Sequence, residues 1–324
     1  MESLERLKGK KILVTGGTGF VGSHVVEQLL EKGAFVVVSY RSSDPRSYFF
    51  LQNLSKRVVM AVCDIKDRVR VFELITRWEI THIIHLAAVA TVDVALANPV
   101  ETIATNVLGT ANILESARNA TGVKGVIVAS SDKAYGKSQK TLLETDPLAG
   151  DHPYEVSKSS ADLLATAYYK TYGLPVVITR FGNIYGPGDN NFSRIIPGIM
   201  QSLVSRQTLT IRSDGTHVRD YVYVADVARA YVFLLEHLER IKGEAFNVSS
   251  NDSSSVSDVV KISQKILKKK ISFRIANTAK NEIPFQHLDW EKIYKLGWRP
   301  KTRFTQGIKE TYKWYTKHKR KIFV

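Results

Sequence analysis

Two residues near the middle of this 324-residue chain have the types and the spacing for acid–base chemistry. Tyr154 and Lys158 stand at the two ends of "YEVSK", so in a helix they would lie one above the other on the same face. The pKa of a free tyrosine is about 10, and a neighbouring ammonium group lowers it by stabilising the phenolate. Such a pair can accept the proton of a hydroxyl group while hydride leaves the same carbon. Because a tyrosine and a lysine four residues apart often occur by chance, a catalytic role for this pair depends on the other motifs in the chain.

A second reactive pair follows the apolar run "KGVIVA". The stretch "SSDKAYG" (130–136) places an acid, Asp132, directly before a base, Lys133. At the end of a buried strand, such a pair could supply a proton donor and a proton acceptor. The same two residues could also form an ion pair that only covers the end of the strand.

A glycine-rich turn stands near the N-terminus, between a predicted strand and a predicted helix. "TGGTGFVG" (15–22) has the spacing of a dinucleotide-binding turn. In such a turn the first glycine allows the tight bend, the second lets the backbone approach the pyrophosphate, and the third lets helix and strand pack closely. The N-terminus of the helix then offers free N–H groups to the phosphates. We therefore expect dinucleotide binding by Gly16, Thr18, Gly19, Phe20, Val21 and Gly22.

The end of the next predicted strand, "SYRSSD", bears on the choice between NAD and NADP. An acid at this place binds the ribose 2′-hydroxyl, whereas an arginine accommodates a 2′-phosphate. Tyr40 stands where the acid would be, and Arg41 and Ser42 follow, which favours NADP over NAD. Asp64, after a third strand, could reach the adenine with the Ile65 backbone beside it, or could instead be a helix N-cap.

The elements that must position these residues alternate along the first half of the chain. Apolar runs predict buried strands, and helical periodicity follows most of them. This alternation predicts a Rossmann-type, doubly wound parallel sheet with helices on both faces. Residues 175–186 predict a further strand that runs into a loop. The sequence after it is more mixed, and for it we expect a smaller mixed α/β domain. The expected strands are 11–16, 34–40, 58–64, 81–88 and 124–131, and the expected helices include 23–33, 105–120 and 154–172.

Domain boundaries follow from the same pattern. We expect residues 1–178 to form the dinucleotide-binding domain, with part of 216–250 returning to it. Residues 179–324 should mainly form the substrate-binding domain.

Composition limits the classes of function. The net charge of +15 and the isoelectric point near 9.7 suggest anionic partners, such as phosphorylated small molecules. The basic runs lack the interleaved aromatic residues of a nucleic-acid groove, so we expect no nucleic-acid partner. No apolar run is long enough for a membrane span and no signal-peptide core is evident, which favours the cytoplasm. The single cysteine, Cys63, is expected to be buried, and no metal framework is expected.

The motifs together resemble the extended short-chain dehydrogenase/reductase superfamily, in its nucleotide-sugar branch. The resemblance covers nearly the whole chain through "TGGTGFVGSH", "HLAA" (85–88), "NVLGTANILE", "PYEVSK", "TRFGNIYGPGD", "RDYVYVADVA" and "LGWRPKT". It implies a C-terminal part that holds a nucleotide-diphosphate sugar, and commonly a homodimer formed through paired helices. It also implies that Leu86, Ala87 and Ala88 lie beside the cofactor.

Within this branch the resemblance implies a 4,6-dehydratase. Ser131 would bond the substrate's 4-hydroxyl, Lys133 would remove the C5 proton once C4 is oxidised, and Asp132 would protonate the departing C6 hydroxyl. "SSDKAYG" is similar to CDP-glucose 4,6-dehydratases, and the segment after the second strand is more similar to GDP-mannose 4,6-dehydratases. A 4-epimerase or a C4-oxidising decarboxylase of the same superfamily remains the alternative, and a non-catalytic nucleotide-binding regulator comes from a different class. The nucleotide and the sugar stay open.

Three further residues receive roles from the resemblance. Asn183 would orient the substrate near the cofactor, and Arg194 and Arg219 would contact the diphosphate, for which the forked guanidinium group is suited. The alternative for the two arginines is an ordinary salt bridge. His85 lies in an apolar strand and is expected to be a core histidine rather than a catalyst.

Overall fold

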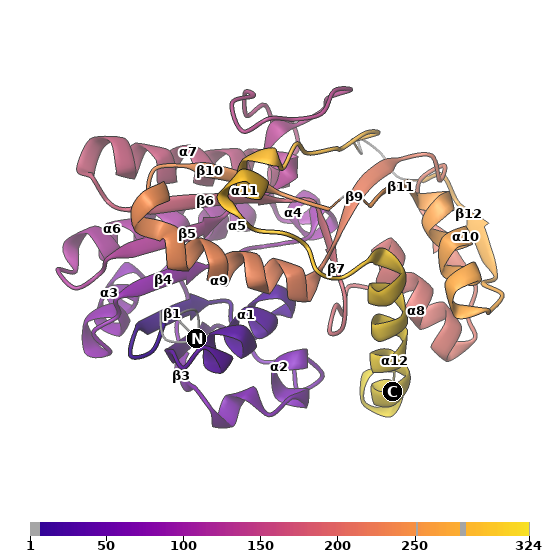
Figure 1. The fold of residues 1–324 in the computed structure, drawn as a ribbon, viewed down its shortest axis with the longest axis horizontal. Helices are drawn as coiled ribbons and strands as arrows, with labels where there is room; N and C mark the ends of the chain where they lie inside the picture. Colours follow the sequence, from indigo (N-terminus) through magenta and orange to yellow (C-terminus); the bar gives the residue numbers. More distant parts are fainter. Residues whose placement is uncertain (1–6, 251, 279–282, 324) are drawn as a thin grey trace. The chain divides into compact units, whose positions relative to one another are not determined.

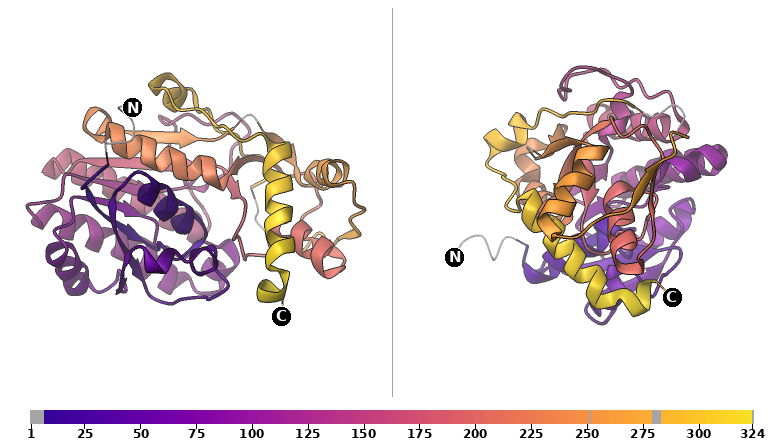
Figure 2. Two further views of the ribbon diagram at one scale, coloured as in Figure 1. Left: turned by 60° about the horizontal axis from the view of Figure 1, so that its bottom comes forward. Right: turned by 90° about the vertical axis from the view of Figure 1, so that its right-hand side faces the viewer.

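The computed structural model of the protein describes residues 7–250, 252–278 and 283–323, and Figures 1 and 2 show its elements. The chain forms two compact units, which we describe separately. The first contains the chain up to residue 136 together with 144–180 and 228–247. The second contains 137–143, 181–227 and the chain from 248 onward. Each unit is therefore assembled from segments that are discontinuous in the sequence.

A seven-stranded sheet is the centre of the first unit. Its strand order is β10-β6-β5-β4-β1-β2-β3, and the pairs from β6 through β3 are parallel. The interior strands are almost entirely buried, as expected for strands covered on both faces. The predicted doubly wound fold is thus confirmed. The strands are β1 (Lys11–Thr15), β2 (Phe35–Tyr40), β3 (Val59–Val62), β4 (His82–His85), β5 (Gly125–Ala129), β6 (Val176–Phe181) and β10 (Ala245–Val248).

Helices cover both faces of this sheet (Figures 1 and 2). One face packs against α3 (Arg68–Arg77), α6 (Gly109–Asn119) and α7 (Pro153–Tyr172), whose apolar side chains form a common core with the strands. The other face is covered by α1 (Phe20–Glu31) and by α9 (Val224–Ile241), which places Leu238 against Gly125 of β5. The shorter elements are α2 (Tyr48–Leu51), η1 (Leu54–Lys56), α4 (Val92–Ala97), α5 (Pro99–Ile103), η2 (Ala104–Leu108) and η3 (Asp132–Tyr135).

The strand predicted in 175–186 is confirmed as β6, but the loop expected after it contains a second short strand, β7 (Asn183–Tyr185), which follows Gly182 and belongs to a different sheet. β6 ends at Phe181 in the seven-stranded sheet, and β7 belongs to a separate three-stranded sheet. A Cβ atom at Gly182 would lie 3.0 Å from the Cβ of Asp220. The glycine therefore allows a close approach to its neighbouring strand where the chain changes sheets.

The second unit is built around small sheets and four helices in the described part of the chain. β7 pairs in parallel with β9 (Val218–Tyr223), which pairs antiparallel with β11 (Ser253–Ser255). β8 (Leu209–Ile211) pairs in parallel with β12 (Phe273–Ile275). The helices are α8 (Ile195–Ser205), α10 (Val256–Leu267), α11 (Glu291–Leu296) and α12 (Phe304–Ile322). None of the helices in the described ranges is long and apolar enough to cross a bilayer.

Candidate active site

The predicted site residues of the first unit follow strands that end at the same edge of the sheet. Thr15 at the end of β1 pairs with His85 at the end of β4, which pairs with Val128 of β5. β1 lies between β2 and β4, so the direction of the strand order reverses beside the glycine turn. In open α/β sheets, ligands bind outside the carboxyl ends of the strands at such a reversal.

The glycine turn fits a dinucleotide. Gly16 has φ +67° and packs so closely on the "HLAA" segment that a Cβ atom would lie 2.9 Å from Ala87 Cα. A Cβ atom at Gly22 would lie 2.3 Å from the Gly16 carbonyl oxygen. Helix α1 begins after Gly19, which has no side chain to cap it, and the first turn contains no acidic residue. The first N–H groups of α1 are therefore in the setting that favours a bound phosphate.

The "HLAA" segment is fixed beside this turn by Thr15. The Thr15 hydroxyl oxygen accepts hydrogen bonds from the backbone N–H groups of Leu86 and Ala87, both at 3.1 Å. The predicted cofactor residues on the two segments are thus brought together.

Tyr154 and Lys158 lie on α7, as the sequence predicts. The helix begins after His152, whose Nδ1 accepts a hydrogen bond from the N–H of Tyr154, and Pro153 occupies its first turn. Both predicted catalytic side chains are mostly buried, and Lys158 Nζ donates a 2.8 Å hydrogen bond to the Ala129 carbonyl at the end of β5. Burial lowers the pKa of Lys158 from 10.5 to about 8, although nearby Asp162 acts in the opposite direction. A buried ammonium that titrates close to neutral pH suits a proton-transfer site.

The "SSDKAYG" stretch forms a short 3₁₀ turn, η3, directly after β5. The Ser131 hydroxyl donates to Oδ1 of Asp132 at 2.9 Å and accepts a hydrogen bond from the Lys133 N–H at 3.2 Å. Lys133 Nζ lies 3.3 Å from the same Asp132 oxygen. Only 3% of the Asp132 side chain is exposed, compared with 21% for Lys133. The carboxyl group therefore lies inside the protein, and the proton-transfer role of the pair and its role as an ion pair that covers the strand end both stay predictions.

Helix α7 and turn η3 are joined by side chains. The Ser159 hydroxyl donates to the Ala134 carbonyl of η3 at 2.7 Å, while Lys158 bonds the end of β5, just before the turn. The acid and base of η3 are thus held against the helix that carries Tyr154. Ser159 had no role in the sequence analysis, and only its position next to Lys158 could have singled it out.

Asn106 is another residue that sequence reasoning left without a role. It lies in η2, a π-helical turn between α5 and α6, an irregularity that frequently occurs at functional sites. Its amide group exchanges hydrogen bonds with the backbone of Val89 and donates to the Ser157 hydroxyl at 2.9 Å, which donates in turn to the Tyr154 carbonyl at 2.7 Å. The "NVLGT" motif was the available signal, but the irregular turn was not predictable from it.

His85 is a buried core residue, as predicted. Its Nδ1 lies 2.8 Å from the Thr15 hydroxyl and its Nε2 lies 3.0 Å from the Thr110 hydroxyl. Burial, with the nearby charge of Lys158, lowers its pKa to about 3. The imidazole is therefore neutral and joins β1, β4 and α6.

Arg41 and Asp64, which follow β2 and β3, belong to a charged cluster that the sequence did not reveal. Arg41 Nη1 lies 3.1 Å from Oε1 of Glu101 and 4.0 Å from Oδ2 of Asp64. Lys66 binds the same Glu101 carboxylate at 2.8 Å, and this hydrogen bond leads the interactions that lower the pKa of Glu101. Ser42 is exposed on the loop after β2.

The alternative of Asp64 as a helix N-cap is wrong. The N-cap of α3 is Asp67, whose side chain accepts a hydrogen bond from the Arg70 N–H. Asp64 Oδ1 instead accepts one from the Lys66 N–H at 3.0 Å. Ile65 is buried, and its carbonyl accepts a hydrogen bond from Asn112.

The predicted substrate residues Asn183, Arg194 and Arg219 all belong to the second unit. Asn183 of β7 pairs with Tyr221 of β9, two positions beyond Arg219. Arg194 Nη1 lies 2.6 Å from Asp189 Oδ2, and its Nη2 donates to the Ile184 carbonyl. The Arg219 guanidinium donates to the Val218 and Pro284 carbonyls. Both arginines therefore have intramolecular partners, and their diphosphate contacts stay predictions.

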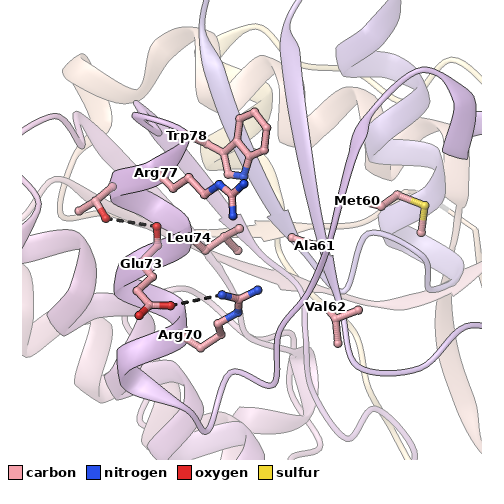
Figure 3. A pocket seen from close by; sticks show the side chains of 9 residues that line it. Met60, Ala61, Val62, Arg70, Glu73, Leu74, Arg77 and Trp78 are labelled. Carbon is pink, nitrogen blue, oxygen red and sulfur yellow. Dashed lines mark hydrogen bonds and ion pairs between the residues drawn. The ribbon is translucent and has the colours of Figure 1, made fainter.

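A pocket lies between β3 and α3 in the first unit (Figure 3). Its charged groups Arg70 and Glu73 are paired with each other at 3.2 Å, and the Arg77 guanidinium lies over the ring of Trp78. None of the predicted site residues lines it, and we assign it no catalytic role. The pocket is lined by Met60, Ala61, Val62, Arg70, Glu73, Leu74, Thr76, Arg77 and Trp78. Within the described ranges, no cluster of His, Cys, Asp or Glu side chains could hold a metal ion.

Comparison with known proteins identifies the family. Residues 13–311 match the family described as GDP-mannose 4,6 dehydratase, and the chain belongs to this family. This result confirms the predicted superfamily and its nucleotide-sugar branch. The closer likeness to CDP-glucose dehydratases stays a prediction.

One similar curated protein is the trifunctional UDP-glucose 4,6-dehydratase/UDP-4-keto-6-deoxy-D-glucose 3,5-epimerase/UDP-4-keto-L-rhamnose-reductase of Arabidopsis thaliana. It is 33% identical over 322 residues, which are 95% of this chain and 47% of the plant protein. The chain thus spans about half the length of this relative.

Two solved structures resemble the chain over almost its whole length. The dTDP-glucose 4,6-dehydratase of Streptomyces venezuelae, solved with NAD bound, is 31% identical with a TM-score of 0.88, covering 96% of this chain and 98% of that one. The UDP-glucose 4-epimerase of Thermotoga maritima is 30% identical with a TM-score of 0.86, covering 95% and 99%. The fold is therefore shared by dehydratases and epimerases, and only the site residues can distinguish the two reactions.

Proposed function

We propose that the protein is a nucleotide-sugar 4,6-dehydratase, which converts a nucleotide-diphosphate sugar to the 4-keto-6-deoxy sugar. One observation carries the proposal: the buried carboxyl group of Asp132 lies beside Lys133 on a turn that is hydrogen-bonded to the helix of Tyr154 and Lys158. An enzyme that only oxidises and reduces C4 has no evident need for this second acid–base pair.

The residues divide the reaction between them. Tyr154 accepts the proton of the 4-hydroxyl, assisted by the positive charge of Lys158, while Ser131 orients that hydroxyl. The chemistry that a bound nicotinamide cofactor supplies is uptake of the C4 hydride and its later return to C6. Lys133 removes the C5 proton, which the new ketone makes acidic, and Asp132 protonates the C6 hydroxyl so that it leaves as water. Lys133 then returns a proton to C5. Tyr154 releases the proton taken from the 4-hydroxyl and Asp132 takes up a proton again, so the sum is loss of one water molecule.

The similarity to an epimerase supports one alternative, a nucleotide-sugar 4-epimerase. A C4-oxidising decarboxylase of the same superfamily is the other.

Separate incubation with CDP-glucose, GDP-mannose, UDP-glucose, dTDP-glucose and UDP-N-acetylglucosamine, followed by mass spectrometry of the product, tests the proposal. We expect loss of the mass of water from at least one donor. An altered sugar of unchanged mass would support the epimerase, and no loss of water from any donor would refute the dehydratase for these substrates. Loss of carbon dioxide from a matching uronic acid donor would support the decarboxylase.

We further propose NADP as the preferred cofactor, with Arg41 binding the 2′-phosphate. More than half of the Arg41 side chain is exposed, so a phosphate can reach it, but Glu101 already occupies one side of its guanidinium. The phosphate would therefore compete with Glu101. We expect Arg41→Ala to weaken NADP binding by roughly tenfold or more while leaving NAD binding unchanged, and Glu101→Gln to strengthen NADP binding. Equal NADP affinity of the wild type and Arg41→Ala in a calorimetric titration would refute this assignment.

The partner and location expected from the sequence belong to the same proposal. We propose a homodimer, supported by exposed apolar side chains on α5 and α7, two helices that pack against each other. These side chains are Val100, Ile103, Val156 and Leu163. In the second unit, we propose that Arg194 and Arg219 hold the nucleotide diphosphate and that Asn183 orients the substrate near the cofactor. A cytoplasmic location stays a prediction from the sequence.

A further inference from the structure

The turn that carries Asp132 and Lys133 ends on a buried tyrosine. Tyr135 is only 3% exposed, and its hydroxyl donates to Asn247 Oδ1 and accepts from Arg180 Nη1, both at 2.7 Å. Burial raises the pKa of Tyr135 to about 12, against the opposing effect of Arg180, so the hydroxyl keeps the proton that it donates. Tyr135 therefore ties the last residue of η3 to β6 and β10.

Arg180 is itself held from several directions. Its Nε and Nη2 form a two-point ion pair with Asp162 of α7, at 2.8 and 2.9 Å. Its Nη1 also donates to the Glu144 carbonyl at 3.0 Å, and the guanidinium lies 4.8 Å from the centre of the Tyr135 ring. Asp162 and Arg180 are both buried, and a buried ion pair with its hydrogen bonds satisfied permits little movement. Arg180 thus offers the tyrosine a fixed partner.

Each part of η3 has its own attachment. Ser131 caps the start of the turn, Ser159 binds the Ala134 carbonyl in its middle, and Tyr135 fixes its end. After Tyr135 the chain turns at Gly136, which has φ +71°, and a Cβ atom there would lie 2.1 Å from the Ala149 carbonyl oxygen. Of these attachments, only that of Tyr135 reaches β6 and β10.

We propose that Tyr135, held by Arg180 and Asn247, is the positioning residue that sets Asp132 and Lys133 for the elimination of water. The inference rests on the proposed dehydratase function. It assigns Tyr135 no contact with the substrate and no part in the oxidation at C4, which belongs to Ser131, Tyr154 and Lys158. Loss of the hydroxyl should therefore slow one step of the reaction rather than all of them.

The test compares Tyr135→Phe and Asn247→Leu with the wild type and with Tyr168→Phe. The control also removes a tyrosine hydroxyl, one that bonds Glu115 at 3.2 Å from the C-terminal part of α7. We expect kcat to fall by about 10-fold to 100-fold in the first two variants, because a small displacement of reacting groups has such an effect. KM should change by less than about threefold, and the reduced fraction of the cofactor during turnover, measured by its absorbance, should rise because the elimination delays hydride return. Tyr168→Phe should behave as the wild type.

A second measurement on the protein without substrate separates this inference from the proposed function. The N–H groups of Ala134 and Gly136 are bonded within the turn, and in Tyr135→Phe we expect their hydrogen exchange to quicken by about fivefold or more relative to Tyr168→Phe. Unchanged exchange would overturn the inference. So would a fall in kcat with no rise in reduced cofactor, or a wild-type kcat despite faster exchange. Faster exchange in a protein whose wild type removes water from no nucleotide sugar would refute the function and leave the attachment of the turn standing.

Discussion

The ammonium nitrogen of Lys133 lies 3.3 Å from Oδ1 of Asp132, a carboxyl group almost completely buried at the end of β5. The two side chains are neighbours in the sequence, yet the turn directs them to a common point. This proximity leaves two roles open for Lys133: it can be the base itself, or it can hold the aspartate in position. The two roles of Lys133 predict different activities for variants at this position.

Asp132→Asn should stop the elimination but not the oxidation. The amide has the size of the carboxyl group but cannot protonate the C6 hydroxyl, so we expect kcat to fall by roughly 10² to 10⁴. Because Tyr154 and Lys158 are unchanged, reduced cofactor should accumulate, and its absorbance together with the rate of 4-keto-6-deoxy product measures both effects. Glu239→Gln, an exposed change on α9, is the control. An Asp132→Asn enzyme with wild-type turnover would remove Asp132 from the mechanism.

The Lys133→Arg variant distinguishes a role of Lys133 as the C5 base from a role in positioning Asp132. Arginine keeps the positive charge near Asp132 but cannot accept the C5 proton, because it stays protonated in proteins. If Lys133 is the base, Lys133→Arg and Lys133→Ala should both lose about 10² or more of kcat, and exchange of solvent deuterium into C5 should be lost. Retained exchange and near-normal turnover in Lys133→Arg, with loss in Lys133→Ala, would assign the holding role.

The buried Lys158 predicts a specific pH dependence of stability. Its pKa is 10.5 in the unfolded chain and about 8 in the folded protein, so between these values the unfolded chain binds the proton that the folded protein has released. Stability therefore rises with pH across this window, and below pH 8 the burial of the charge costs on the order of 3 kcal/mol. Urea unfolding of the wild type and Lys158→Met from about pH 7 to about pH 10 measures the difference. We expect the advantage of Lys158→Met to shrink as pH rises, and a constant difference would contradict the assignment.

Gly22→Ala should disrupt the cofactor site. The new Cβ would lie 2.3 Å from the Gly16 carbonyl oxygen and 2.7 Å from Gly17 Cα, and both contacts are with backbone that cannot move aside without opening the turn. We expect a loss of about 1 to 3 kcal/mol in unfolding free energy and a roughly tenfold or greater loss in cofactor affinity. Gly122→Ala is the matched control, since its nearest contact would be 3.8 Å away. Normal cofactor binding by Gly22→Ala would show that the turn does not approach the ligand as proposed.

Leu163→Lys tests the proposed dimer. Leu163 is 58% exposed on α7, a helix that packs against α5, and a charge in a helix-paired interface would be desolvated without a partner. Sedimentation analysis should find a dimer for the wild type and mainly monomer for Leu163→Lys. Val69→Lys, which changes a similarly exposed residue of α3, should remain dimeric. A wild-type monomer would refute the proposal directly.

The sequence predicted the central sheet well because two-sided burial leaves a strong local signal. A continuous apolar run such as 125–129 is typical of a strand that is buried on both faces of a parallel sheet. The glycine turn and the Tyr154–Lys158 spacing are likewise patterns of residues that lie close together in the sequence. What escaped prediction depends on residues far apart in the chain. Tyr135 meets Arg180 across 45 positions and Asn247 across 112. Arg41 meets Glu101 across 60. No periodicity encodes such pairs, since they exist only after the strands have been ordered in the sheet.

The two-sided bonding of His85 has a practical consequence for chemical labelling. Both ring nitrogens are occupied, by Thr15 and Thr110, and the ring is neutral and almost fully buried. An acylating reagent that attacks exposed neutral imidazoles would therefore leave His85 unmodified in the folded enzyme. Such a reagent could report unfolding of the sheet, because His85 becomes reactive only when β1, β4 and α6 separate.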